Sequence, residues 1–465
     1  MYLERFFDEG LAHASYLVGC QASGDAIVID AARHTKPYRE AAAREGLRIV
    51  AVTETHIHAD YLSGTRQLAH ETGAKMYLSA EGGDGWQYTF LGPQDRLIRD
   101  GDLISIGNLT LKVLHTPGHT PEHLSFELTD RPATEAPLGV FTGDFVFVGD
   151  VGRPDLLERA AGFKETMRLG AHHLFDSLQA FASRPDHLQI WPAHGAGSAC
   201  GKALGSLPSS VLAYEKLSNW GFKVQDEARF VDEVLEGQPE PPKYFAHMKR
   251  INKLGPPLLE AAQPRWGGRE ELRRAVEQGQ LVIDLRGVDE FVAGHLPGSI
   301  YLPTGKQLVT WAGWLIPYDQ PFSVLLGARE KAEQTLLALQ SIGLDQVEHL
   351  YLPDALEGQS LRSSERVKPN EIDWDQEFIL DVRSAREFAE GHLPQAHNIH
   401  LGYLTDRLDE IPNSPLLHCR SGMRSLIASS LLERAGKSPK DVVGGYDAIL
   451  KEATNLGGRK VSKTE

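Results

Sequence analysis

The segment Thr55-His56-Ile57-His58-Ala59-Asp60-Tyr61 decides which fold this chain adopts. It places two imidazoles and a carboxylate at alternate positions, directly after the apolar run at residues 49–53, which we expect to be a buried strand. Imidazole and carboxylate groups are common ligands of transition metals in proteins. The segment therefore predicts a metal-binding loop at the end of a strand.

The pattern on either side of this segment mixes strands and helices. Residues 27–30 form a second apolar run, and an alanine- and arginine-rich helical stretch separates it from residues 49–53. Short strands with glycine turns are predicted near residues 109–114, 124–128 and 140–145, followed by a helix at about 158–182. This mixture favours an α/β fold of the αββα sandwich type over a wholly parallel sheet.

Three further segments each place one candidate ligand after an apolar stretch. They are Thr116-Pro117-Gly118-His119, Thr142-Gly143-Asp144 and Pro192-Ala193-His194-Gly195. Taken alone, a histidine or aspartate beside a turn is more often a hydrogen-bonding or capping group than a ligand. Four such segments in this order resemble the metallo-β-lactamase superfamily. That resemblance implies an αββα sandwich with the ligands gathered at one edge.

Tyr61 bears on the number of metals. In that superfamily a histidine of a second metal site normally stands where this chain has Tyr61. A phenol is a poor replacement for imidazole near neutral pH. A mononuclear site is therefore favoured over the dinuclear zinc site of a hydrolase.

Within the superfamily, residues 1–243 are similar to the persulfide dioxygenases, relatives of glyoxalase II that bind one ferrous iron. The resemblance implies that His56, His119 and Asp144 bind one Fe(II) per chain. Two imidazoles and one carboxylate form the facial triad of non-haem iron sites, which leaves positions for substrate and dioxygen. Zinc is the alternative metal in this site when the protein is purified.

The same resemblance assigns roles around the metal. His58, Asp60 and His194 are expected nearby, where they orient ligands or bind water, and His58 is open to a second interpretation as a ligand of a zinc site. Arg153 matches a position that contacts the thiol carrier, and an ion pair with a neighbouring aspartate, Asp150 or Asp155, is the equal alternative. Tyr61 either hydrogen-bonds the substrate or packs.

The second half of the chain repeats itself. Val-Ile-Asp-Leu-Arg at residues 282–286, with Gly-His-Leu-Pro at 294–297, recurs with identical spacing as Ile-Leu-Asp-Val-Arg at 379–383 and Gly-His-Leu-Pro at 391–394. This repeat predicts two tandem α/β domains. We expect a first domain at residues 1–243, a second at 256–355 and a third at 367–465, joined by proline-rich and by charged, serine-rich stretches.

The third domain carries a reactive cysteine motif. Cys419-Arg420-Ser421-Gly422-Met423-Arg424 follows an apolar strand and precedes a predicted helix at residues 426–435. Backbone N–H groups and the helix N-terminus favour a thiolate, and Arg420 and Arg424 add positive charge, so we expect a depressed pKa and a nucleophilic Cys419. The motif and its loop length resemble the active loop of the rhodaneses, which are sulfurtransferases. A buried, inert cysteine is the alternative.

The second domain lacks this motif. Matching the Gly-x-Arg elements of the two copies puts Val324 where Cys419 lies, so no nucleophile remains. We expect an inactive rhodanese-like module that spaces the other domains or supports oligomer contacts. Its Trp311 and Trp314 are interface anchors or, more commonly for large aromatics, core residues.

Composition limits the remaining possibilities. The three cysteines are too few for a disulfide scaffold, which favours a reducing cytoplasm. Cys20 suits a core position, and Cys200, close after His194, is either buried or a sulfur relay. A net charge of -15 disfavours nucleic acid and anionic membranes, and no apolar run is long enough for a membrane span. A homo-oligomer is expected.

Over nearly its full length the chain resembles the CstB-like persulfide dioxygenase–rhodanese fusions. This resemblance implies that a low-molecular-weight thiol persulfide and dioxygen give sulfite and thiol, and that Cys419 passes sulfane sulfur to sulfite to give thiosulfate, or the reverse, in sulfide detoxification. One alternative is a glyoxalase II-like zinc thioester hydrolase with an attached rhodanese. Another is a noncatalytic sulfur carrier.

Overall fold

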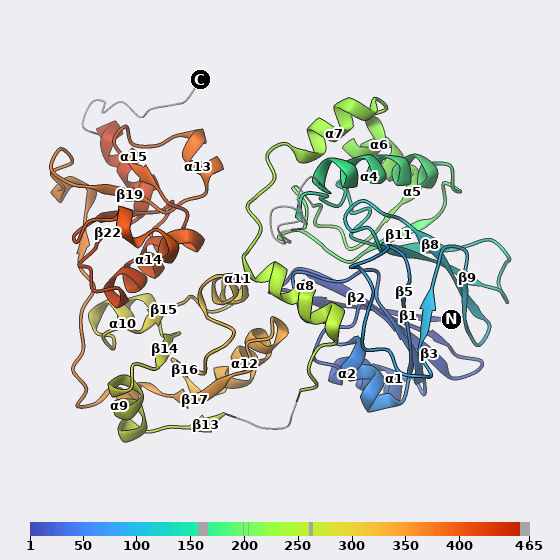
Figure 1. The fold of residues 1–465 in the computed structure, drawn as a ribbon, viewed down its shortest axis with the longest axis horizontal. Helices are drawn as coiled ribbons and strands as arrows, with labels where there is room; N and C mark the ends of the chain where they lie inside the picture. The colour runs from blue at the N-terminus through green and yellow to red at the C-terminus, as the bar shows by residue number, and fades with distance from the viewer. Residues whose placement is uncertain (157–165, 199, 203, 260–263, 456–465) are drawn as a thin grey trace. The chain divides into compact units, whose positions relative to one another are not determined.

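The computed structural model describes residues 1–156, 166–198, 200–202, 204–259 and 264–455 (Figure 1). The chain divides into two compact units, residues 1–260 with 340–343, and residues 261–339 with 344–465. No helix among the described residues is long and apolar enough to cross a membrane.

Two six-stranded sheets form the first unit, with strand orders β1-β2-β3-β4-β5-β6 and β12-β11-β10-β9-β8-β7. The first sheet is antiparallel from β1 to β3 and parallel from β3 to β6. Its strands are β1 (Tyr2–Asp8), β2 (His13–Cys20), β3 (Asp25–Ile29), β4 (Arg48–Thr53), β5 (Lys75–Ser79) and β6 (Arg96–Ile98). The strands of the second sheet are β7 (Leu103–Ile106), β8 (Leu109–His115), β9 (Leu124–Asp130), β10 (Gly139–Gly143), β11 (Gln189–Pro192) and β12 (Ser210–Val211).

Three apolar layers hold this unit together. One lies between the first sheet and the helices α1 and α2, a second lies between the two sheets, and a third lies between the second sheet and helices α4 to α7. The helices are α1 (Lys36–Arg44), α2 (Thr65–Thr72), α4 (Thr166–Ala182), α5 (Leu212–Ser218), α6 (Trp220–Lys223), α7 (Glu227–Leu235) and α8 (Tyr244–Leu254). The order helix, sheet, sheet, helix confirms the predicted αββα sandwich.

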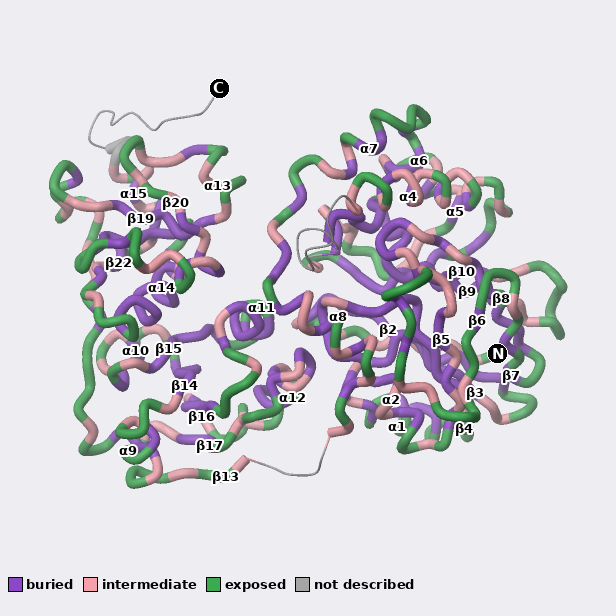
Figure 2. The backbone as a smooth tube through the Cα atoms, in the orientation of Figure 1, coloured by how far each residue is buried: buried purple, intermediate pink, exposed green. Residues whose placement is uncertain are grey.

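Strand β3 shows why its sequence is apolar from Ala26 to Ile29. Ala26 and Val28 pack in the layer under the helices, whereas Ile27 and Ile29 pack between the two sheets. Successive side chains of a strand point to opposite faces, so a strand buried on both faces has no polar positions. Figure 2 shows these central strands as buried. The predicted strands at residues 27–30, 49–53, 109–114 and 124–128 are confirmed, and the described part of the predicted helix is α4.

Two five-stranded parallel sheets form the second unit, with strand orders β13-β17-β16-β14-β15 and β18-β22-β21-β19-β20. The first has β13 (Arg265–Trp266), β14 (Leu281–Asp284), β15 (Ile300–Tyr301), β16 (Phe322–Leu325) and β17 (Val347–Tyr351), with α9 (Arg269–Glu277), α10 (Val288–Ala293), α11 (Lys306–Leu315), η1 (Arg329–Lys331), α12 (Ala332–Ser341) and η2 (Pro353–Leu356). The second has β18 (Arg366–Val367), β19 (Ile379–Asp381), β20 (His397–Asn398), β21 (Leu416–His418) and β22 (Lys440–Val442), with η3 (Pro369–Glu371), α13 (Ala385–Glu390), η4 (Leu401–Asp406), η5 (Leu408–Glu410), α14 (Met423–Arg434) and α15 (Gly445–Asn455). The shared strand order confirms the predicted tandem repeat.

Strand register corrects one prediction about this repeat. Asp284 pairs with Leu325 in the first copy, and Asp381 pairs with His418 in the second. Leu325 is thus the counterpart of His418, and the next residue, Leu326, is the counterpart of Cys419. The assignment of Val324 to this position was wrong, because a short Gly-x-Arg match does not fix strand register. The first copy still has no nucleophile there.

The two repeats pack against each other through tryptophans. The Trp314 ring of α11 lies 5.3 Å from the rings of His400 and Tyr403 at the start of η4, and Trp311 lies 6.2 Å from His400. Across the same interface, His295 pairs with Glu433 at 2.8 Å. Trp311 and Trp314 are therefore interface anchors between the repeats.

Gly402 leaves no room for a side chain at this interface. A Cβ atom at this position would lie 2.3 Å from the Trp314 ring. We expect Gly402→Ala to destabilise the second unit by about 1–3 kcal/mol, because overpacking displaces a buried ring. For a unit of this size the thermal transition should fall by roughly 2–10 °C in calorimetry. Gly268→Ala, whose added Cβ meets only the end of the Glu271 side chain at 3.5 Å, is the control.

Candidate active sites

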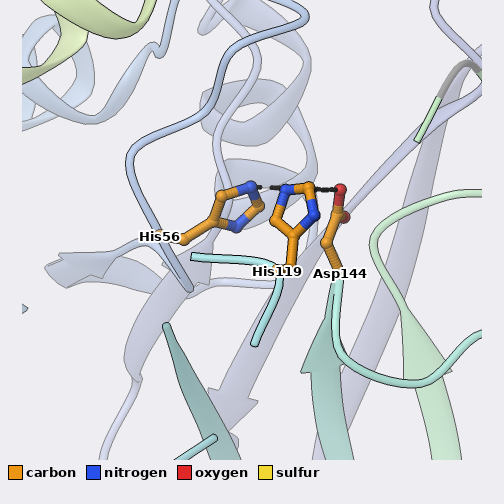
Figure 3. Close-up of side chains that lie close together, drawn as sticks. All are labelled: His56, His119 and Asp144. Atoms are coloured by element: carbon orange, nitrogen blue, oxygen red, sulfur yellow. Dashed lines mark ion pairs between the residues drawn. The ribbon is translucent and has the colours of Figure 1, made fainter. Parts of the chain in front are cut away.

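His56, His119 and Asp144 meet at one end of the sandwich (Figure 3). They lie after β4, between β8 and β9, and after β10, respectively. The Oδ2 atom of Asp144 is 3.5 Å from Nε2 of His119 and 3.9 Å from Nε2 of His56. All three residues are buried, and their ligand atoms lie within 4.8 Å of one another. This spacing suits three ligands of one metal ion.

Hydrogen bonds on the far side of each ring set the tautomer of these histidines. Nδ1 of His119 lies 3.0 Å from the carbonyl oxygen of Arg153, so it carries the proton and donates it. Nδ1 of His56 lies 3.0 Å from the Thr55 hydroxyl, which in turn donates to Asp30. Each Nε2 is then left with a lone pair toward Asp144. Burial lowers the pKa of both histidines well below normal, which keeps them neutral.

Asp144 is the strongest indication that a cation belongs here. Both of its carboxylate oxygens are buried, and within the described ranges neither accepts a hydrogen bond from an N–H or O–H group, the thiol of Cys200 being the neighbouring weak donor. Burial raises the pKa of this carboxyl group to about 6. A buried carboxylate without donors is costly unless a cation compensates it. The residues therefore fit a transition-metal ion with two nitrogen ligands and one oxygen ligand.

A second group of possible ligands adjoins the first. Asp60, His194 and Cys200 place their ligand atoms within 4.8 Å of one another, and all three are buried. Nε2 of His194 lies 3.3 Å from Asp60 and 3.4 Å from Asp144, and its Nδ1 lies 3.1 Å from the carbonyl oxygen of Ala12. The expectation of a mononuclear site stays a prediction, because this second group also offers three ligand atoms.

Cys419 lies in a separate site in the second unit, directly after β21. The side chain of this cysteine is buried. The Gly422 N–H group donates to its Sγ atom at 3.1 Å, and the Ser425 hydroxyl lies 3.6 Å away. Helix α14 begins at Met423, so its N-terminus faces the loop. These donors are positioned to stabilise a thiolate or the outer sulfur of a persulfide.

Comparison with known proteins identifies the domains that carry the two sites. The model of the metallo-beta-lactamase superfamily matches residues 8–194, and the model of the rhodanese-like domain matches residues 268–351 and 366–452. A solved metallo-beta-lactamase structure from Staphylococcus aureus is 40% identical and covers 76% of this chain and 99% of its own, with a TM-score of 0.69. The chain belongs to the metallo-β-lactamase superfamily. Two rhodanese-like domains follow its metallo-β-lactamase domain, as predicted.

Relatives of the metallo-β-lactamase domain include two kinds of enzyme. The human mitochondrial persulfide dioxygenase is 29% identical over 194 residues, 41% of this chain and 67% of that protein. A hydroxyacylglutathione hydrolase of Prochlorococcus marinus is 30% identical over 174 residues, 37% of this chain and 62% of that protein. The chain spans 60% to 67% of the length of the curated relatives it matches. The match to the human enzyme shows homology to the persulfide dioxygenases.

In the metallo-β-lactamase domain, His58 and Tyr61 both turn toward Asp30. Nε2 of His58 lies 3.1 Å from an Asp30 oxygen, and the Tyr61 hydroxyl donates to the Asp30 carbonyl at 3.3 Å. Burial by itself lowers the pKa of His58, but the nearby carboxylates, Asp30 foremost, raise it to about 9. Nδ1 of His58 has no hydrogen-bond partner in the described structure. Tyr61 is fully buried against the ring of His13, 4.1 Å between centroids.

Asp30 is a residue that the sequence analysis missed. It directly follows β3, adopts a left-handed φ of 54°, and accepts from the Thr55 N–H group at 2.6 Å. It therefore organises His56, His58 and Tyr61 together. The sequence did offer a signal for Asp30. It is an aspartate directly after a buried strand, and that strand pairs with the strand that precedes the metal segment.

Arg153 takes one of its two predicted alternatives. Its fully buried guanidinium donates to both oxygens of Asp155, at 2.8 and 2.7 Å, and to the carbonyl oxygen of Pro239. Its own carbonyl also orients His119. A contact with the thiol carrier stays a prediction.

Lys249 of α8 is a further missed residue near the metal ligands. Its ammonium lies 4.2 Å above the Trp86 ring, and burial lowers its pKa to about 8, opposed by the Glu122 carboxylate. Glu122 accepts from the N–H of Ile57 at 3.0 Å, inside the metal segment. No local motif marks this lysine, because it comes from a helix more than 100 residues away along the chain.

In the third domain the two loop arginines differ. Arg424 makes a bidentate ion pair with Glu387 at 2.6 and 2.7 Å. Burial opposes charge on Glu387, but Arg424 and Ser384 hold the pKa of Glu387 down at about 2. Arg420 is exposed, and its Nε lies 3.8 Å from Asp447. Both arginines line a cavity with Cys419. Asp381 and Arg383 of the repeated motif form a buried ion pair under the Tyr446 ring.

Proposed function

We propose that this protein oxidises the persulfide of a low-molecular-weight thiol in its metallo-β-lactamase domain and transfers sulfane sulfur through Cys419. In the first reaction, thiol persulfide, dioxygen and water give thiol, sulfite and two protons. The observation that carries the proposal is the buried group of two neutral imidazoles and one carboxylate, His56, His119 and Asp144. Homology to persulfide dioxygenases supports the same assignment.

The protein residues would act mainly by position. His56, His119 and Asp144 would hold one Fe(II), which when bound supplies the activation of dioxygen. Thr55 and the Arg153 carbonyl keep the two imidazoles in the tautomer that presents Nε2. His194 and Asp60 lie beside Asp144, where they can hold a water molecule or a proton.

The sulfur-transfer step is a displacement at a sulfur atom. A sulfite sulfur lone pair attacks the outer sulfur of a persulfide on Cys419. The new S–S bond gives thiosulfate, and the electron pair of the broken bond returns to Cys419 as a thiolate. The Gly422 N–H group and Ser425 hydroxyl, which face Sγ, support this leaving thiolate.

The test of the function is oxygen uptake by iron-loaded protein given glutathione, coenzyme A or bacillithiol persulfide. We expect uptake with at least one carrier, with sulfite and thiosulfate among the products. No uptake with any carrier would contradict the proposal.

A zinc thioester hydrolase is the second candidate function. It is favoured by the hydroxyacylglutathione hydrolase relatives and by the adjoining group of Asp60, His194 and Cys200, which offers ligands for a second metal. A noncatalytic sulfur carrier is a third. Thioester cleavage by zinc-loaded protein without oxygen uptake would identify the hydrolase, and a Cys419 persulfide without repeated turnover would identify the carrier.

Cys200 allows a narrow test of a sulfur relay. Burial, and after it the charge of Asp144, raises the pKa of its thiol, so a relay would require assisted proton loss. If Cys200 carries sulfur, Cys200→Ser should lower the thiosulfate share of the products at least threefold and leave oxygen uptake within about twofold. An unchanged product ratio would contradict the relay. Metal content measured on the same sample would show whether the change instead disturbs the metal.

A further inference from the structure

The cavity at Cys419 has walls from both rhodanese-like domains. It has a volume of about 380 Å³, and the catalytic loop contributes Cys419, Arg420, Ser421, Met423 and Arg424. The other lining residues are Gln307, Thr310 and Trp311, all from α11 of the repeat that has no nucleophile. The pocket in front of the reactive sulfur is therefore completed by the neighbouring repeat.

Helix α11 is held firmly at this position. Trp311 and Trp314 are buried against His400 and Tyr403, and Gly402 allows the close approach of the Trp314 ring. Gln307 and Thr310 lie on the exposed side of the same helix, one turn apart. The tryptophans thus fix the helix, and the two polar side chains face the cavity.

The charge of the cavity favours anions. Of the described residues that line it, two are arginines and none is acidic. The charge of Arg424 is largely balanced by Glu387, whereas the nearest carboxylate of Arg420 is 3.8 Å away on an exposed surface. The Gln307 amide and the Thr310 hydroxyl add neutral hydrogen-bond donors. Together these groups can neutralise and orient a small oxyanion.

We propose that α11 of the nucleophile-free repeat is the specificity wall of the sulfur-transfer site, and that Gln307 and Thr310 bind the oxygens of a small sulfur oxyanion in front of Cys419. This assignment rests on the proposed sulfur transfer at Cys419. It explains why a domain without a nucleophile keeps a packed tryptophan interface. Sulfite would be oriented with its sulfur toward the persulfide, and thiosulfate would leave by the same route.

The first test uses alkylation of Cys419, which does not depend on turnover. Iodoacetate is an anion and iodoacetamide is its neutral counterpart, and mass spectrometry of the full-length protein reports modification of Cys419 itself. We expect Gln307→Glu to lower the ratio of the iodoacetate rate to the iodoacetamide rate about threefold or more at low ionic strength, because a negative charge enters the cavity. Gln307→Lys should raise this ratio.

Gln334→Glu is the matched control, since Gln334 is an exposed glutamine of α12 in the same domain and is not among the cavity residues. It should leave the ratio unchanged. Thr310→Glu is a second probe on the same wall and should act like Gln307→Glu. An unchanged ratio in both wall variants would overturn the proposal.

The second test measures sulfite-dependent thiosulfate formation. Gln307→Glu should raise KM for sulfite about threefold or more, because the added negative charge repels the anion that this wall would bind. An unchanged KM would overturn the binding role. A protein with no sulfur transfer, but with the predicted change in alkylation ratio, would overturn the proposed function and not the assignment of the wall.

Discussion

Cys419→Ser should abolish thiosulfate formation from persulfide and sulfite, by about a thousandfold or more, and should leave oxygen uptake unchanged. A serine hydroxyl fits the same space and keeps the contact with the Gly422 N–H group. It does not ionise near neutral pH and does not form a persulfide. Sulfite should therefore accumulate in place of thiosulfate, as ion chromatography of the products would show.

Cys20→Ser is the matched control for this variant. Cys20 is also buried, and its Sγ accepts from the Asn108 N–H group at 3.3 Å in the metallo-β-lactamase domain. It should retain thiosulfate formation. If Cys419→Ser still makes thiosulfate at the parent rate, sulfur transfer occurs elsewhere or without the protein, and the role given to the loop is wrong.

Asp144→Asn should remove the metal and with it oxygen uptake, by about a hundredfold or more. Asparagine keeps the shape of the side chain but lacks the charge that compensates a cation in this buried site. Iron per chain, measured by plasma mass spectrometry after reconstitution, should fall to near zero. His119→Ala should behave in the same way, and His172→Ala, a partly exposed residue of α4 that pairs with Glu227, should not.

The unfolding temperature of the metal-free protein distinguishes two roles of Asp144, that of a metal ligand and that of a carboxylate that stabilises the fold. Without metal, the parent protein buries a carboxylate that accepts no hydrogen bond from an N–H or O–H group in the described structure and has only the weak thiol donor of Cys200 beside it. Metal-free Asp144→Asn should therefore unfold at the same temperature as the metal-free parent or at a higher one. A lower unfolding temperature would mean that Asp144 supports the fold, and its assignment as a ligand would fail.

The parts of this structure that depend on local sequence were predictable. His56, His119 and Asp144 each follow a strand of the sandwich, and strand ends bring such residues to one edge. The repeat was visible because its spacing is identical in the two copies. These features need only short segments and the periodicity of strands and helices.

The parts of the structure that depend on contacts between distant segments could not be predicted from the sequence. Lys249 of α8 lies over the Trp86 ring, and Glu387 of α13 pairs with Arg424, so neither has a signal near the residue it contacts. The counterpart of Cys419 was misplaced by two residues because register follows from pairing with β14. Gln307 and Thr310 line the cavity through a contact between domains, which no motif in either domain records.

The tryptophan interface has a practical consequence for anyone who wishes to produce the rhodanese-like domain that contains Cys419 alone. A fragment that starts at the third domain would expose to water the surface around His400, Gly402 and Tyr403 that Trp314 now covers. Exposed aromatic patches of this kind promote aggregation. The smallest fragment worth expressing therefore contains both repeats, which form one compact unit.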